Sequence, residues 1–134
     1  GSWPAIWLLG DESKNKWPDC GEIDIMEHIG NNQDVVYGSL HYPERFGGNA
    51  DSDTVPVPGV SNNFHVYSVE WNAQTIKFFV DGVEFHSYNN NSNSPFNDPF
   101  FIRMNIAMGG TFGGNIDPNF TESMMEIDYI RVYQ

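Results

Sequence analysis

Glycine and proline occur so often along this chain that long helices are excluded. The 134 residues include 13 glycines and 8 prolines, and both residue types weaken a helix interior. Between them lie short runs rich in β-branched and aromatic residues, which is the composition typical of strands. We predict about seven strands, at Gly21–Ile29, Val35–His41, Phe64–Trp71, Thr75–Asp81, Val83–Tyr88, Phe100–Ala107 and Met125–Tyr133.

The segments between the strands predict how the strands are connected. Asp81-Gly82 lies between two strand-like runs, and this dipeptide favours a hairpin turn that needs positive φ at both residues. Long loops are predicted where Asn, Gly, Pro and Ser gather, at Gly47–Asn63, Asn89–Asp98 and Gly109–Asn119. Trp71 lies in an alternating strand and is predicted to be a core residue. Many short strands separated by turns predict an all-β antiparallel sandwich that forms one domain over residues 1–134.

The charge of the chain excludes several classes of partner. There are 6 basic and 18 acidic residues, so the net charge is −12. Nucleic acid and anionic membrane surfaces would be repelled. No apolar run reaches the roughly 18 residues that a membrane span needs, and the single cysteine, Cys20, excludes an internal disulfide framework. A hydrophobic content of 40% still predicts a packed globular domain.

Three carboxylates lie in one apolar strand, in the segment Gly21–Glu27. In a regular strand Glu22 and Asp24 share one face and Glu27 points to the other. One extra residue accommodated as a β-bulge near Ile25-Met26 would place all three on the same face. Acids gathered in this way repel one another, which raises at least one pKa.

A pair of carboxylates on one face is the arrangement that a retaining glycosidase needs. One carboxylate attacks the anomeric carbon, and the other donates a proton to the leaving oxygen. The alternative is a solvated acidic face, which the apolar neighbours of the three acids disfavour. The nearby tryptophans, Trp3, Trp7 and Trp17, would suit a cleft in which sugar rings stack on aromatic faces.

These residues resemble those of family 16 glycoside hydrolases, and most of all its endo-β-1,3-glucanases (laminarinases). The resemblance rests first on two segments, Trp3–Gly10 and Trp17–Glu27, the second of which contains the motif E-x-D-x-x-E. It continues over nearly the whole chain, through Phe64–Tyr67, Phe79–Gly82, Asn105–Gly110 and Asp128–Tyr133. It implies a jelly-roll (concanavalin-like) sandwich with a sugar cleft across its concave sheet.

The resemblance also implies roles for individual residues. Glu22 is expected to be the nucleophile, Glu27 the acid/base and Asp24 the assisting residue between them. The extra residue before Glu27 is typical of the branch that contains laminarinases, and it supports the bulge. Further substrate-binding residues implied by the resemblance are Trp3, Trp7, His41 and Asn105.

The chain departs from the family pattern at three places. Thr111-Phe112 stands where many members carry a tryptophan after Gly-Gly, so the sugar contact there is expected to differ. Many members bind a structural calcium ion, for which Asp128 is a candidate ligand, but the partner ligands come from N-terminal residues that this chain does not contain. The chain begins at a motif found near the middle of the family domain, so we expect it to be the C-terminal part of a catalytic domain that lacks N-terminal strands.

The expected function is endo-acting hydrolysis of β-1,3 or mixed β-1,3/1,4 glucan with retention of configuration, without a cofactor for catalysis. Two alternatives stay open: a galactan hydrolase of the agarase type, and a non-catalytic glucan-binding module. The carboxylate trio favours an enzyme, because a binding module needs aromatic residues but no paired glutamates. The substrate is a polymer found outside cells, so we expect a secreted or cell-surface protein, and we expect a monomer.

Overall fold

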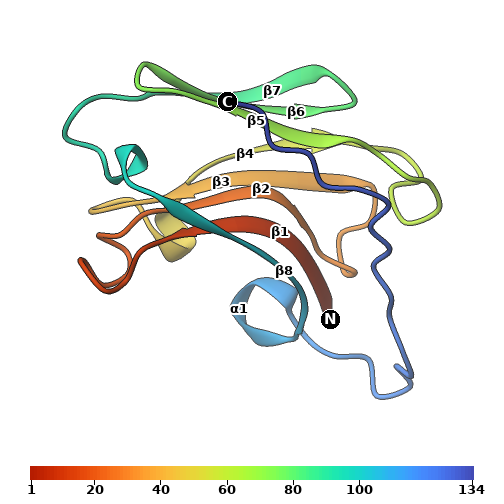
Figure 1. Cartoon of the computed structure of the whole chain (residues 1–134). Helices are drawn as coiled ribbons and strands as arrows, with labels where there is room; N and C mark the ends of the chain where they lie inside the picture. The colour runs from red at the N-terminus through yellow and green to blue at the C-terminus, as the bar shows by residue number, and fades with distance from the viewer.

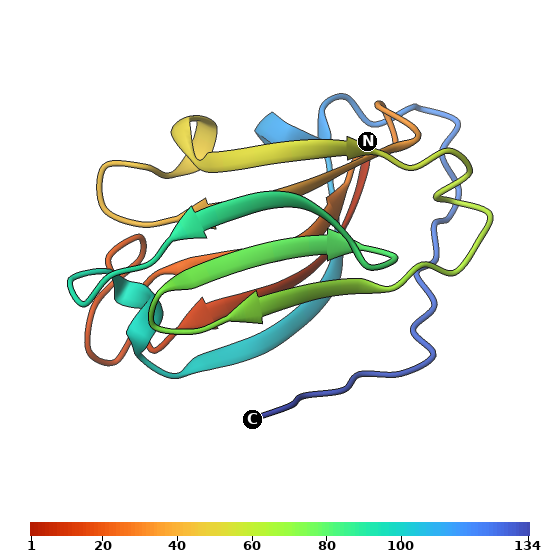
Figure 2. The ribbon, with the colours of Figure 1, turned by 90° about the horizontal axis from the view of Figure 1, so that it is seen from above.

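Two antiparallel sheets make up the computed structural model, which describes residues 1–134. A five-stranded sheet has the order β4-β3-β2-β1-β8, and a three-stranded sheet has the order β5-β6-β7. The two sheets lie over one another as layers (Figures 1 and 2). The strands are β1 (Ser2–Gly10), β2 (Glu22–His28), β3 (Val35–His41), β4 (Asp51–Pro56), β5 (Tyr67–Trp71), β6 (Thr75–Val80), β7 (Val83–Asn89) and β8 (Phe100–Met108). The prediction of an all-β antiparallel sandwich is confirmed.

The core lies between the two sheets and is built by alternation along the strands. Alternate residues of β2 and β3 point inward, and Ile23, Val36 and Leu40 are completely buried. From the smaller sheet, Ile76 and Phe78 of β6 pack against Ile23 and Leu40. Burying such side chains contributes about 1.5–3 kcal/mol each, so this layer holds β2 in place.

The other face of the five-stranded sheet is free of the smaller sheet. Figure 1 shows the sheet curved, with its concave side turned away from β5–β7. The one-turn helix α1 (Gly110–Gly113) lies on this concave side near the start of β1 (Figure 1). Functional side chains of β1 and β2 that do not enter the core therefore reach a single curved surface.

Two strands were not among those predicted. β1 contains Pro4, and proline cannot donate to a sheet ladder, yet β1 pairs with β2 on one side and β8 on the other. β4 falls inside the predicted loop Gly47–Asn63 because its sequence is polar. It is an exposed edge strand beside β3, where charged residues discourage edge-to-edge association.

Two predicted strands need correction. The predicted strand Phe64–Trp71 begins only at Tyr67. Val66 is instead bound to Asp81 at the neighbouring turn: its N–H donates to the Asp81 carboxylate, and its backbone oxygen accepts from the Asp81 N–H. The prediction of a strand at Met125–Tyr133 is wrong: these residues form no strand and run outside the sheets (Figure 2). Their pattern suits a strand, but a strand also needs a partner for its backbone groups.

The predicted hairpin turn is confirmed, with φ of 50° at Asp81 and 79° at Gly82 between β6 and β7. Trp71 is not the core residue that was predicted, because it is 37% exposed. Its indole N–H donates to the backbone oxygen of Phe96 and its ring packs on Phe100. The helices of the structure are all too short or too polar to cross a membrane.

Candidate active site

A bulge in β2 places the three acids of the Glu22–Glu27 segment on the concave face. Against β3, Asp24 pairs with Ser39 and Glu27 pairs with Tyr37. Three steps along β2 therefore match two steps along β3, which is the geometry of a single extra residue. The bulge predicted from the phase of the carboxylates is present, and Asp24 and Glu27 are only 3% and 6% exposed.

Glu22 is held at one end of the row by two side chains. The indole N–H of Trp17 donates to Glu22 Oε2 over 2.7 Å. His41, directly opposite Glu22 on β3, has its Nε2 atom 3.8 Å from Glu22 Oε1 and 3.0 Å from Asp24 Oδ2. The ring of Trp17 also contacts those of His41 and Phe46, which makes this end of the face aromatic.

The loop after β3 decides which nitrogen of His41 carries the proton. The backbone N–H of Gly47 donates to His41 Nδ1 over 3.0 Å, so Nδ1 must be the unprotonated nitrogen and Nε2 the N–H. Ligand atoms of Glu22, Asp24 and His41 lie within 4.8 Å of one another. Because Nε2 presents a proton rather than a lone pair, this arrangement fits proton chemistry better than metal coordination.

Glu27 lies at the other end of the row with its own donors. The indole N–H of Trp3 donates to Glu27 Oε1 over 2.9 Å, and the Ser39 hydroxyl donates to Oε2 over 3.3 Å. Ser39 in turn contacts the hydroxyl of Ser52 on β4 over 2.8 Å. Both carboxylate oxygens of Glu27 are therefore oriented by the strands on either side of β2.

Burial raises the pKa of all three carboxyls. For Glu22, burial and the neighbouring Asp24 raise the pKa to about 7. For Asp24, burial and the charge of Glu27 raise the pKa well above its ordinary value. Burial also raises the pKa of Glu27, against the hydrogen bond from Trp3, which lowers it. The row therefore holds protons at pH values where isolated carboxyls are ionised, as acid/base catalysis requires.

The remaining predicted substrate-binding residues form a second polar contact on the same face. Trp7 of β1 pairs with Asp24 of β2, and its indole N–H donates to Asn105 Oδ1 on β8 over 2.8 Å. The structure thus brings all four residues, Trp3, Trp7, His41 and Asn105, onto the face that carries the acids. Their roles in binding remain predictions.

Sequence reasoning did not single out several residues of the site. Ser39 lies two positions before His41 on β3, so strand periodicity would place both on one face. Phe112, noted only as a departure from the family pattern, packs edge-on against Trp3 and Tyr37, with ring centroids 5.2 and 5.0 Å apart. No local signal connects Gly47 to His41, since that contact depends on the path of the loop.

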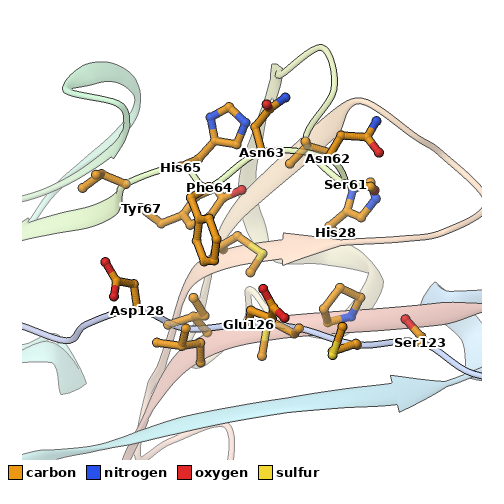
Figure 3. Close-up of a pocket in the computed structure, with 18 of the residues that line it drawn as sticks. His28, Ser61, Asn62, Asn63, Phe64, His65, Tyr67, Ser123, Glu126 and Asp128 are labelled. Carbon is orange, nitrogen blue, oxygen red and sulfur yellow. The ribbon is translucent and has the colours of Figure 1, made fainter.

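A cavity lies on the opposite side of the sheet from the acids. It has a volume of about 640 Å³ and lies between the first strands, residues 60–67 and the C-terminal run (Figure 3). From β1 it is lined by Pro4 and Ile6, and from β2 by Met26 and His28, the residues that alternate with Trp3, Trp7 and Glu27. The cavity therefore does not belong to the candidate active site.

Asp128 lines this cavity together with Glu126 (Figure 3). It belongs to no group of three acidic, histidine or cysteine side chains with converging ligand atoms. Calcium takes six to eight oxygen ligands, and the role of Asp128 as one of them stays a prediction.

Comparison with known proteins gives a consistent set of relatives. The sequence pattern described as "Glycosyl hydrolases family 16" matches residues 1–131. A β-glucanase from Rhodothermus marinus is 39% identical over all of this chain, which spans 52% of that protein. Glucan endo-1,3-beta-glucosidase A1 from Niallia circulans is 36% identical, again over the whole chain and 22% of that protein. The chain thus spans about half or less of the length of these relatives.

Solved structures agree with the sequence comparisons. The laminarinase from Rhodothermus marinus has a TM-score of 0.81 and 40% identity, over 88% of this chain and 53% of that one. A LamA variant from Z. galactanivorans, in complex with laminaritriose and laminaritetraose, has a TM-score of 0.80 and 38% identity, over 90% of this chain and 54% of that chain. The fold is thus the jelly roll that the resemblance implied. With the carboxylate row and the match over residues 1–131, this chain belongs to glycoside hydrolase family 16.

Proposed function

We propose that this protein hydrolyses internal β-1,3 bonds of glucans, or mixed β-1,3/1,4 bonds, with retention of configuration. The observation that carries the proposal is the row of Glu22, Asp24 and Glu27 on one face of β2, in which Asp24 and Glu27 are buried and Glu22 is partly buried. The relatives named β-glucanase and glucan endo-1,3-beta-glucosidase support the choice of substrate. A non-catalytic binding module would have no use for a row of three carboxyls of which two are buried, because burying a carboxyl costs free energy.

In the first step, the Glu22 carboxylate attacks the anomeric carbon while Glu27 gives its proton to the glycosidic oxygen. The carbon–oxygen bond breaks, the shortened glucan leaves, and a glycosyl ester forms on Glu22. In the second step, Glu27, now a carboxylate, takes a proton from water. That water attacks the ester and restores Glu22, so two inversions give net retention.

The groups around the row suit these roles. Trp17 orients Glu22 by donating to one of its oxygens, while the other oxygen is left for attack. Burial and the charge of Glu27 raise the pKa of Asp24 well above its ordinary value, which disfavours a second charge beside the nucleophile. Burial raises the pKa of Glu27, which favours the protonated form that a proton donor needs.

The proposed function is tested by incubating the protein with laminarin, mixed-linkage glucan and agarose. We expect a series of laminarioligosaccharides from laminarin, released first as β-anomers that proton NMR detects before mutarotation. Products from agarose alone would instead identify a galactan hydrolase. Binding of laminarin with no release of reducing ends would leave only the binding function.

Replacing Trp3 with phenylalanine should move the basic limb of the pH–activity profile to higher pH. The Trp3 N–H stabilises the ionised form of Glu27 and so lowers its pKa. Removing this donor raises that pKa, and Glu27 then keeps its catalytic proton to higher pH. The matched control is Trp7→Phe, because the Trp7 N–H donates to Asn105 rather than to a carboxylate. An equal shift in both variants, or none in Trp3→Phe, would contradict the assignment.

The location and the oligomeric state are part of the same proposal. Glucans of this kind are polymers found outside cells, so we propose that the enzyme is secreted or lies at the cell surface. For the oligomeric state we propose a monomer. The mechanism takes its nucleophile and its proton donor from side chains, so catalysis needs no cofactor.

A further inference from the structure

Arg103 lies on the concave face, at the edge of the five-stranded sheet. It belongs to β8, which pairs with β1 in the five-stranded sheet. Its partner residue on β1 is Trp7. Paired residues of adjacent strands project to the same side of a sheet, so Arg103 lies on the same face as Trp7. Asn105 lies on this face too, because it is two residues after Arg103 on β8. The guanidinium carbon lies 5.4 Å from the centre of the Trp7 ring.

The donors of this arginine are not used within the protein. Among the other basic residues, Lys14, Arg45 and Lys77 each pair with a carboxylate. Arg103 has no carboxylate partner, although the chain carries 18 acidic residues. A guanidinium presents five N–H groups in a rigid plane, and here that plane is held over a tryptophan by a cation–π contact.

The register of β8, β1 and β2 places this arginine where a substrate chain would pass. The ladder pairs run from Arg103 to Trp7 and from Trp7 to Asp24, so the arginine is in line with the centre of the carboxylate row. A glucan chain lying across the strands would leave the acids, pass Trp7 and reach the β8 edge. Sugar hydroxyls are good acceptors for guanidinium N–H groups, and they need no charge.

We propose that Arg103 is a substrate-binding residue that donates hydrogen bonds to the hydroxyls of a neutral glucose unit beside Trp7, away from the cleaved bond. The assignment rests on the proposed glucanase function and adds a specificity residue to it. Because β1 separates Arg103 on β8 from the carboxylate row on β2, Arg103 binds only oligosaccharides long enough to extend from that row to β8. It therefore sets the preferred length of the substrate and leaves the chemical step unchanged.

The test compares Arg103→Met with a matched control, Arg131→Met. Arg131 also stacks on an aromatic ring, that of Tyr129 at 4.3 Å, but it lies in the C-terminal run off the concave face. Kinetics are measured on laminarioligosaccharides of two to seven units. For the longer ones we expect Arg103→Met to raise KM about 10-fold or more, as loss of a charged hydrogen bond does, with kcat within about twofold. The shorter ones and the control should be unaffected, and Arg103→Lys should recover part of the loss.

Three results would overturn this assignment. One is an unchanged KM for every length in Arg103→Met. Another is a loss confined to carboxymethylated or sulfated glucans, which would make Arg103 a site for anionic substituents. The last is a fall in kcat at all lengths, which would indicate disturbance of the carboxylate row. If the unsubstituted protein neither binds nor cleaves any laminarioligosaccharide, the proposed function itself falls, and this assignment with it.

Discussion

Glu22→Gln should lose turnover on glucan by a factor on the order of 10⁴ or more while keeping substrate affinity. The amide has nearly the shape of the carboxylate but cannot form the glycosyl ester, and loss of a nucleophile typically costs this much in kcat. The checks are the rate of reducing-end release and the Kd for laminarioligosaccharides by calorimetry. The matched control is Glu12→Gln, which changes an exposed glutamate away from the row and should behave like the unsubstituted protein.

The same substitution should make the protein more stable at neutral pH, which separates loss of chemistry from loss of folding. In the folded state the pKa of Glu22 is raised from 4.5 to about 7, so above pH 4.5 the unfolded chain releases a proton that the folded chain retains. That difference favours unfolding, and its full effect is reached above pH 7. Glutamine removes it, so the free energy of unfolding should rise by about 1–3 kcal/mol at pH 8 and hardly change at pH 4.

Azide distinguishes the nucleophile from the acid/base. In Glu22→Ala the anion enters the space of the missing carboxylate and attacks the anomeric carbon, giving an α-glycosyl azide. This product has the configuration opposite to the β-linked substrate. A Glu22→Ala variant that still hydrolyses laminarin at a near-normal rate would falsify the nucleophile assignment.

Glu27→Ala should lose activity on glucan by about 10²–10⁴-fold, the usual contribution of a positioned acid/base. The loss should be much smaller for the first step on aryl glucosides, because their leaving groups depart without a proton. The basic limb of the pH profile, which reports the proton of Glu27, should disappear. Added azide should replace water in the second step and give a β-glycosyl azide, because Glu22 is intact in this variant.

If instead Glu27→Ala loses activity equally on glucan and on aryl glucosides, proton donation is not its role. Ser39→Ala is the companion variant, because Ser39 donates to Glu27 Oε2 without being able to exchange a proton at the leaving oxygen. It should lower activity far less than Glu27→Ala and leave the basic limb in place.

Much of the site was accessible from the sequence because its signals are local. The alternation of side chains in a strand shows that Glu22 and Asp24 share a face and that Glu27 needs one extra residue to join them. The register of β2 against β3 contains that residue. The Asp81-Gly82 turn was predictable for the same reason, since positive φ is a property of those two residues.

Features that depend on a distant partner were not predictable in this way. Met125–Tyr133 has the pattern of a strand, but pattern alone supplies no neighbour to complete its hydrogen bonds. Asp51–Pro56 looks like a loop, yet it is a strand because the edge of β3 offers pairing groups. The donation from Gly47 to His41 arises from a loop path that no residue pattern records.

The sequence by itself thus determined the fold class, which follows from many short strands separated by turns. It also determined the row of three acids and the bulge that aligns them, because both follow from periodicity within one strand. Only the tertiary structure decided the environment of that row: the Trp3 and Trp17 donors, the tautomer of His41, and the position of Arg103 over Trp7. These contacts join residues that are up to about a hundred positions apart. Their distances, burial and charge, which set the pKa of each carboxyl, exist only once the strands are paired.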